Sequence, residues 1–321
     1  MTESAIAGTA TNNVPTPDAA VIEWLLDSDP SIRWQVMRDL TDQPPDVVEA
    51  ERARIATEGW GAQLLGSQAP NGQWGDSTYG REWTSTTWTL ALLRELGLDP
   101  TSEQAQRAVA LVRENSRWEH DAEPYFEGEV EPCINGLAVA IAAYFGQDVG
   151  AVVERLVSEQ LSDGGWNCEV ENGSVRSSFG TTIAVLEGLL EHEHATGGTP
   201  GSRTARHRAE EYMLERRMMR RLSTGQLIDE AWTRFSFPTY YFYDVLRGLD
   251  YLRAADVAPD ARVTEAIGVV EGRRGEDGRW LQQNPRGGEL PVEMDEGIGQ
   301  PSRWNTLRAL RVLRWYDAAQ P

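Results

Sequence analysis

Three short turns with the same residues at the same spacing decide the fold of this chain. Residues 68–74 read Gln-Ala-Pro-Asn-Gly-Gln-Trp, residues 160–166 read Gln-Leu-Ser-Asp-Gly-Gly-Trp, and residues 274–280 read Arg-Gly-Glu-Asp-Gly-Arg-Trp. Each follows an apolar segment, and Gly readily ends a helix in a left-handed conformation. The Trp can then fold back over the helix end, where the Gln or Arg can stack on the indole and cap the last carbonyls. Three copies indicate an internal repeat.

Each turn is followed by an irregular loop and then by an apolar helix that begins at Ser or Thr. Weaker copies of this unit fill the intervals, and six helix pairs result: 20–41, 64–96, 102–145, 156–190, 203–254 and 269–313. Repeats of about forty residues are typical of paired helices, which bury their apolar faces by stacking. The number of pairs and the long loop before each second helix favour closure of the stacked pairs into a ring. We therefore expect an all-α (α/α)6 toroid in which the second helices line a central cavity.

The composition is that of a globular protein. Of the 321 residues, 40% are hydrophobic and 25% are charged, which is enough for a sizeable core. Residues 1–17 have little to bury and are expected to form a disordered tail, with one toroid domain over 18–321. No run approaches the roughly 18 apolar residues of a membrane helix, and no signal peptide is recognisable. The sequence predicts a cytoplasmic protein without stable membrane insertion.

The charge and the few cysteines exclude several classes of partner. The chain has fifty acidic residues and thirty basic ones, and every basic residue is Arg. The net charge of −20 argues against a nucleic acid as partner. Two cysteines do not make a disulfide scaffold. A metal site would need Cys133, Cys168 and His120 to converge with a carboxylate, but no Cys-x-x-Cys spacing supports this. No metal and no cofactor is predicted.

Aromatic residues mark the expected binding site. In a toroid, the N-termini of the inner helices face one mouth of the cavity and favour anions such as diphosphate or carboxylate there. Aromatic faces in this region can stabilise a cation, although each ring can equally be ordinary core packing. The expected lining is Trp83, Trp88, Phe179, Trp232, Phe235, Phe237, Tyr240, Tyr241, Trp304 and Asn305.

Two carboxylic acids are candidate proton donors. Asp244 lies among aromatic and apolar residues, and such surroundings raise a carboxyl pKa towards neutrality. Its alternative role is an ion pair with Arg247 one turn further on. Glu131 precedes the predicted helix from Pro132 to residue 145, in a loop rich in acidic residues that can equally be a solvated surface.

The Gln-x-x-x-Gly-x-Trp turns resemble the QW motifs of squalene and oxidosqualene cyclases, and the chain from about residue 20 to 317 looks like that superfamily. The same toroid occurs in the β subunits of protein prenyltransferases. The resemblance implies an apolar central cavity that holds an isoprenoid chain. It therefore favours a terpene-cyclase-like enzyme with a small apolar substrate and acid-initiated carbocation chemistry.

The catalytic motifs of those families are missing. The Asp-x-Asp-Asp motif of class II cyclases is absent, and its nearest equivalents are Glu129-Val130-Glu131-Pro132-Cys133 and Glu293-x-Asp295-Glu296. The zinc-binding Asp-x-Cys-Tyr-Ser sequence of prenyltransferases and the DDxxD motif of class I synthases are absent too. Two alternatives therefore stay open: a non-catalytic toroid that binds a lipid or a protein, and a glycoside-active (α/α)6 barrel, which needs two carboxylates in a cleft.

Overall fold

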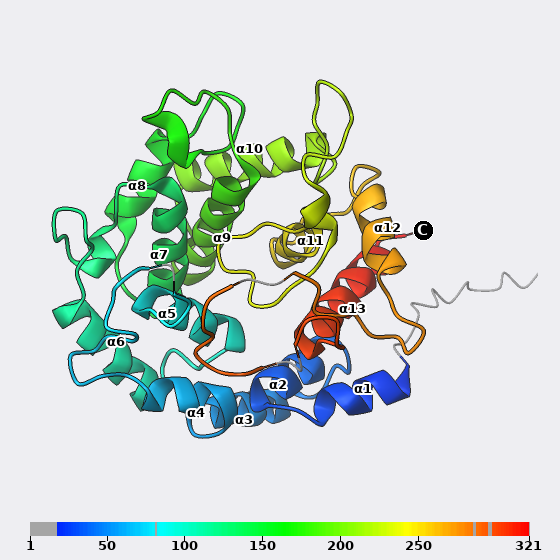
Figure 1. Cartoon of the computed structure of the whole chain (residues 1–321), viewed down its shortest axis with the longest axis horizontal. Helices are drawn as coiled ribbons and strands as arrows, with labels where there is room; N and C mark the ends of the chain where they lie inside the picture. Colours follow the sequence, from blue (N-terminus) through cyan, green and yellow to red (C-terminus); the bar gives the residue numbers. More distant parts are fainter. Residues whose placement is uncertain (1–17, 81, 285–286, 295–296, 321) are drawn as a thin grey trace, which may run out of the picture.

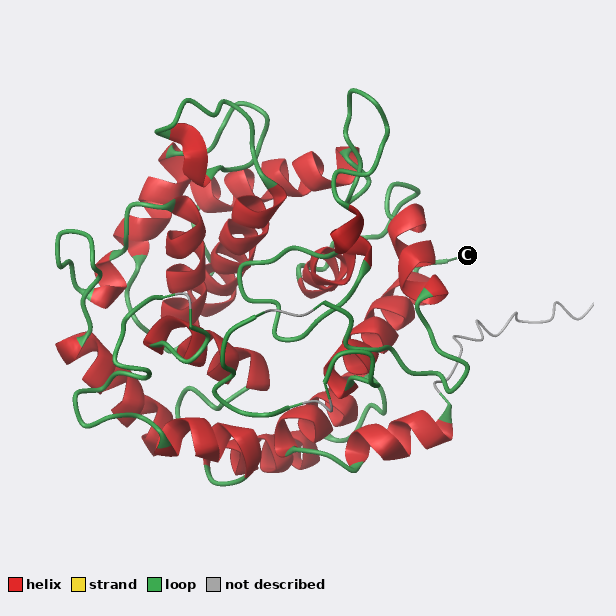
Figure 2. Cartoon of the chain, viewed as in Figure 1, coloured by secondary structure: helices red, strands yellow, loops and turns green. Residues whose placement is uncertain are grey.

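The computed structural model describes residues 18–80, 82–284, 287–294 and 297–320, so the predicted tail over 1–17 lies outside the described residues. Regular secondary structure within these ranges is helical, which confirms the expected all-α class (Figure 2). None of the described helices is both long and apolar enough to cross a membrane. The α-helices are α1 (Ala19–Leu26), α2 (Pro30–Asp39), α3 (Pro45–Ala53), α4 (Gly59–Gly66), α5 (Thr86–Leu96), α6 (Glu103–Asn115), α7 (Pro132–Tyr144), α8 (Gly150–Ser158), α9 (Phe179–Thr196), α10 (Pro200–Glu215), α11 (Val245–Ala254), α12 (Thr264–Gly272) and α13 (Arg303–Ala318).

The helices form the six expected pairs around a ring (Figure 1). The outer helices are α1, α4, α6, α8, α10 and α12, with α3 extending the wall before α4. Their partners α2, α5, α7, α9, α11 and α13 lie on the inner side. Four short 3₁₀ helices, at Arg54–Ala56, Tyr125–Glu127, Cys168–Val170 and Glu230–Thr233, lie in the connecting segments.

Helix α13 closes the ring by packing against α2 of the first pair. The Arg311 guanidinium donates to the Gln35 side-chain oxygen at 2.9 Å, and Arg314 donates to the Asp39 carbonyl at 2.8 Å. Arg303 reaches the carbonyl of Trp24 on α1 at 3.3 Å. Charge-assisted bonds from one helix therefore hold the first and last repeats together.

The three repeated turns fold alike, as their spacing predicts. The Trp166 indole N–H donates to the Leu156 carbonyl at the end of the preceding outer helix at 2.7 Å, and its backbone N–H donates to Thr182 Oγ1 on the following inner helix at 3.1 Å. Each Trp thus links the two helices of its pair, the outer one through its indole and the inner one through its backbone N–H. The equivalent contacts are Trp74 to Leu64 (2.7 Å) and Thr86 (3.1 Å), and Trp280 to Val270 (2.7 Å) and Thr306 (3.0 Å).

The Gln of the turn joins adjacent repeats. The Gln160 amide donates to the carbonyls of Gly164 and Ala205, both at 2.7 Å, and Ala205 belongs to the next outer helix. Gln68 does the same at 2.9 and 3.0 Å. In the third copy the Arg274 guanidinium instead lies 5.7 Å from the Trp280 ring centre. The Gln amide therefore connects neighbouring outer helices, and the Arg guanidinium lies near its indole ring.

Gly164→Ala should destabilise the ring more than Gly146→Ala. Both glycines have positive φ, +100° and +70°, so both alanines carry a left-handed strain of about 1–2 kcal/mol. A Cβ at Gly164 would also lie 2.7 Å from the Arg208 carbonyl oxygen of the next outer helix, whereas none would be met at Gly146. We expect the close approach to cost about 1–3 kcal/mol more, measured by urea unfolding. Equal losses would contradict this packing.

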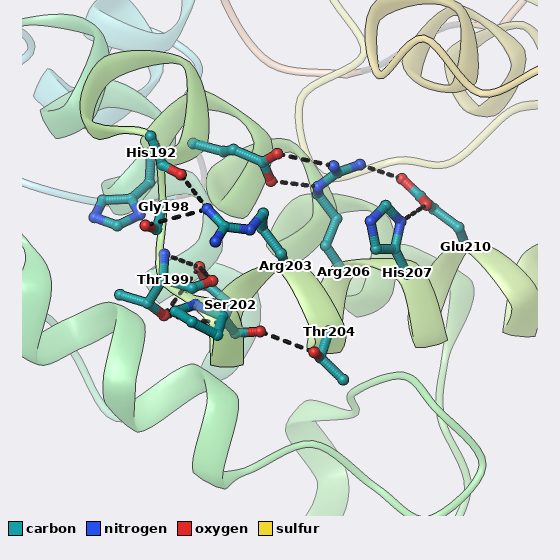
Figure 3. A network of polar contacts seen from close by, with 12 residues as sticks. His192, Gly198, Thr199, Ser202, Arg203, Thr204, Arg206, His207 and Glu210 are labelled. Atoms are coloured by element: carbon teal, nitrogen blue, oxygen red, sulfur yellow. Dashed lines mark hydrogen bonds and ion pairs between the residues drawn. The ribbon is translucent and has the colours of Figure 1, made fainter.

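A buried polar network holds α10 to its two inner neighbours, and Figure 3 shows the part of it around Arg206 and Glu210. The Arg206 guanidinium pairs with Glu193 on α9 at 3.0 Å and with Glu210 on its own helix at 2.5 Å. The Tyr251 hydroxyl on α11 donates to Glu210 at 2.8 Å. Because Arg206 is 4% exposed, these partners are needed to satisfy a buried charge.

Candidate functional site

The inner helices enclose a central cavity of about 280 Å³. Its wall comes from α2, α5, α9, α11 and α13, together with the loop before α11. Among the described residues, five arginines and four carboxylic acids line it, so its wall is more charged than the family resemblance implies. The lining residues are Gln35, Arg94, Glu95, Glu187, Leu190, Glu191, His194, Phe237, Thr239, Arg247, Asp250, Tyr251, Arg253, Ala254, Trp304, Arg308 and Arg311.

A two-pronged ion pair joins α9 to α11 across the wall. The Arg247 guanidinium donates to both oxygens of Glu187, at 2.8 and 2.7 Å. It also donates to the carbonyls of Tyr240 (2.9 Å) and Phe242 (2.7 Å), and so fixes the loop before α11. Burial acts to raise the pKa of Glu187, but Arg247, Arg94 and Arg308 together outweigh it and the pKa is lowered. Glu187 is thus held as a carboxylate.

Glu95 has the opposite electrostatic environment. Burial raises the pKa of its carboxyl, Glu187 adds to the shift, and Arg94, Arg247 and Arg308 oppose it. Among the described residues its Oε2 has no hydrogen-bond partner, although this oxygen is buried. The Nε of neighbouring Arg94 also has no hydrogen-bond partner among the described residues. Arg94 pairs with Glu191 through its Nη1, at 2.9 Å. Glu95 is the cavity acid best suited to hold a proton.

Three arginines share one carboxylate on the far wall. Asp250 pairs with Arg311 and with Arg253 at 2.9 Å, and only distantly with Arg308 at 3.6 Å. Burial acts to raise the pKa of Asp250, but these arginines lower it. Arg308 is 5% exposed, and its hydrogen bond to the Ser236 carbonyl is long at 3.4 Å. The positive charge of Arg308 is therefore the least well compensated in the wall.

Glu95→Gln should stabilise the protein at pH 8 and have no effect near pH 4. Because the folded state holds this proton more tightly than the unfolded chain, the glutamate loses stability as the pH rises above about 4.3, and a neutral amide does not. The comparison is between urea midpoints at the two pH values. Glu191→Gln is the matched control: it deprives Arg94 of its carboxylate and should destabilise at pH 8. A loss of stability in Glu95→Gln at pH 8 would refute the assignment.

The predicted aromatic lining separates into three groups, and only one faces the central cavity. The Phe237 and Trp304 rings stack at 4.1 Å in the cavity wall. Trp83 stacks on Tyr240 at 3.9 Å, with Trp88 and Tyr241 beside them. The last group packs Phe179 and Trp232 at 4.9 Å against other core rings.

The remaining predicted site residues have structural roles. Phe235 is fully buried, and its backbone exchanges hydrogen bonds with Gln283. The Asn305 amide donates to the Leu281 carbonyl at 3.0 Å. Asp244 is buried but caps α11, because its Oδ1 accepts the Arg247 backbone N–H at 2.8 Å. It does not line the cavity, so its expected position as the acid is not supported.

Glu131 lies outside the cavity as well, with both cysteines. Its carboxylate and the two sulfurs all lie within 4.8 Å of one another, whereas His120 is exposed and contacts Asp121 at 3.2 Å. The expected convergence therefore includes the cysteines but not the histidine. The second acidic candidate, Asp295 with Glu296, lies outside the described residues.

Sequence reasoning missed the charged residues that line the cavity. A signal was present: Arg94 and Glu95 interrupt the apolar run Leu-Ala-Leu-Leu of α5, and Glu187 stands among apolar residues of α9. Charged residues inside otherwise apolar inner helices rarely stay buried without partners. Taken together, the charged residues of the inner helices predict that the central cavity has a polar lining.

Comparisons with known proteins give only distant structural similarity. No family model matches, and no curated protein matches. The ligand-free type II terpene cyclase MstE from Scytonema has a TM-score of 0.44 and 17% identity, over 91% of this chain and 88% of that one. A variant of MstE in complex with its substrate, geranylgeranyl dihydroxybenzoate, has a TM-score of 0.42 and 16% identity over the same shares. Likenesses this distant do not identify a ligand.

Proposed function

We propose that the protein binds a small amphiphilic anion in its central cavity and uses Glu95 as a proton donor to it. The observation that carries this proposal is the lining: among the described residues, five guanidinium groups face four carboxyl groups in one cavity, and one of those four is the acid suited to stay protonated. An excess of arginines in a cavity favours an anion.

The wall offers complementary places for the two ends of such a ligand. Arg308, which has only long contacts, and Arg94, whose Nε is unbonded, are the groups that a carboxylate or phosphate would pair with. The stacked rings of Phe237 and Trp304 would cover an apolar body. A volume of about 280 Å³ is near the lower limit of ligand pockets, about 300 Å³, and so favours a short body.

This proposal modifies the isoprenoid hypothesis. A long hydrocarbon would leave buried charges without water or partners, which is costly. A short prenyl diphosphate, such as geranyl diphosphate, combines the required anion with a compact apolar chain. A carboxylic acid with a raised pKa transfers protons effectively near neutral pH, and this suits protonation of an oxygen better than protonation of an unactivated alkene.

The test is a ligand panel read by thermal shift and by mass spectrometry of the products. The panel contains geranyl diphosphate, geranylgeranyl diphosphate, squalene, citrate and 4-hydroxybenzoate. We expect small anions with an apolar body to raise the melting temperature, and squalene to leave it unchanged. A product that is lost in Glu95→Gln would establish the proton donor. Binding without any product would support the non-catalytic toroid, and stabilisation by squalene alone would refute the anion site.

Glycoside hydrolysis is the second candidate, because one observation favours it. Glu95 and Glu187 lie in one cavity, and their environments move their pKa values in opposite directions, as in an acid–base pair. Release of nitrophenol from a panel of nitrophenyl glycosides tests it. Activity that disappears in both Glu95→Gln and Glu187→Gln would support this candidate over the anion ligand.

A further inference from the structure

The two cysteines of the chain meet outside the central cavity. Cys133, in the first turn of α7, and Cys168, at the start of the 3₁₀ helix before α9, have their Sγ atoms 2.6 Å apart. Both are partly exposed. This separation is far shorter than the 3.5–4.0 Å or so of non-bonded heavy atoms and approaches the roughly 2.05 Å of a disulfide bond.

We propose that Cys133 and Cys168 form a redox-active dithiol that closes reversibly to a disulfide by exchange with a small-molecule disulfide. The site lies apart from the central cavity, so the proposal does not depend on the ligand. The alternative occupant is a metal held by both sulfurs and Glu131. Two thiolates on one tetrahedral zinc, each bound at about 2.3 Å, lie about 3.8 Å apart, so the observed pair is too close for that geometry.

The neighbouring groups shift the pKa values of the two thiols in opposite directions. The hydrogen bond between the two sulfurs lowers the pKa of Cys168 against the effect of burial, and Thr181 Oγ1, at 3.4 Å, adds to the shift. The same sulfur contact and burial raise the pKa of Cys133, whose Sγ lies 3.5 Å from Glu131 Oε2. Cys168 is therefore the attacking thiolate, and Cys133 is the thiol that closes the bond.

The steps balance without a further oxidant. The Cys168 thiolate attacks the small disulfide RSSR, forms a mixed disulfide and releases one thiolate, which takes up a proton. Cys133 then gives its proton to Glu131, attacks the Cys168 sulfur and releases the second thiolate, which leaves as RSH with that proton. Two protein thiols are oxidised to one disulfide, and one RSSR is reduced to two RSH.

The fold accommodates the closed form with little movement, because the helices that follow each cysteine already pack closely. A Cβ at Gly136 of α7 would lie 2.6 Å from the Ala184 backbone of α9, and one at Gly188 would lie 2.3 Å from the Gly136 carbonyl oxygen. The bond would close a long loop in the unfolded chain. We expect it to raise the melting temperature by about 5 °C.

The experiment equilibrates the full chain with reduced and oxidised glutathione in varying ratio. Maleimide labelling should show that two thiols disappear together under oxidised glutathione and return under reduced glutathione, with a mass decrease of two hydrogens in the closed form. Cys133→Ser should accumulate a glutathione adduct on Cys168 and show no rise in melting temperature. Cys168→Ser should form its adduct more slowly, since burial and the Glu131 carboxylate still raise the pKa of its remaining thiol.

Two results would overturn the proposal. Both thiols could stay reactive to maleimide at every glutathione ratio, which would mean that the pair does not close. Alternatively, elemental analysis of the purified protein could find one zinc per chain, lost together with thiol protection in Cys133→Ser, which would establish a metal site. All of these readouts are independent of ligand binding in the central cavity.

Discussion

Trp166→Ala should lower the free energy of unfolding by about 3–5 kcal/mol, the range for a large buried aromatic residue. The Trp166 side chain is fully buried, and the indole also satisfies the Leu156 carbonyl at 2.7 Å. The truncation therefore leaves a cavity and an unpaired carbonyl between the two helices of one pair. Urea unfolding at pH 7, followed by circular dichroism, measures the loss.

Trp166→Phe and Leu222→Ala are the controls for this loss. Phenylalanine keeps most of the volume but loses the hydrogen bond, so it should destabilise less than alanine. Leu222 is 59% exposed, and its truncation should change stability by about 0.5 kcal/mol or less. A loss below about 1 kcal/mol in Trp166→Ala would mean that the Trp does not hold the two helices of its pair together.

Asp250→Ala should cost a similar amount, about 3–5 kcal/mol, because it leaves buried arginines without their carboxylate. Arg253, Arg308 and Arg311 all contact Asp250, and of these Arg311 also reaches Asp39 at 3.5 Å. Since these arginines lower the Asp250 pKa, its contribution is complete above the unfolded value of about 3.9 and is lost as the pH falls below it. Urea midpoints of variant and wild type should therefore converge in acid.

Glu103→Ala is the matched control for the loss of a carboxylate. Its side chain is 82% exposed and pairs with Arg107, which is exposed as well. Its removal should cost about 0.5 kcal/mol, as for other exposed ion pairs. If Asp250→Ala cost no more than this, the buried charge cluster would not be a structural element of the ring.

The repeat architecture could be predicted because local chemistry determines it. The Gly-x-Trp turns, the Ser and Thr residues that begin inner helices, and the six apolar pairs each imply the same local unit. Ser178 and Ser302, for example, both cap their helices as expected. The partner of the Gln amide could not be predicted in this way, because Ala205 belongs to another repeat.

The site was harder to predict because it is formed by residues distant in sequence. Nothing local to Glu95 indicates that Glu187 and Arg308 face it across the ring. The aromatic residues were assigned to the cavity because they are dense in sequence around residues 232–243. In the structure, most of these rings pack against other aromatic rings. Asp244 likewise has apolar neighbours, yet its position at a helix start makes it a cap.

The most direct test of the anion site is isothermal titration calorimetry of geranyl diphosphate and geraniol, with wild type and Arg308→Met. These ligands share one apolar chain and differ in the charged group. We predict that the diphosphate binds at least about 100-fold more tightly than the alcohol, which is a difference of about 2.7 kcal/mol in binding free energy. Arg308→Met should remove most of this difference. Equal affinity for both ligands, or a preference unaffected by Arg308→Met, would contradict it.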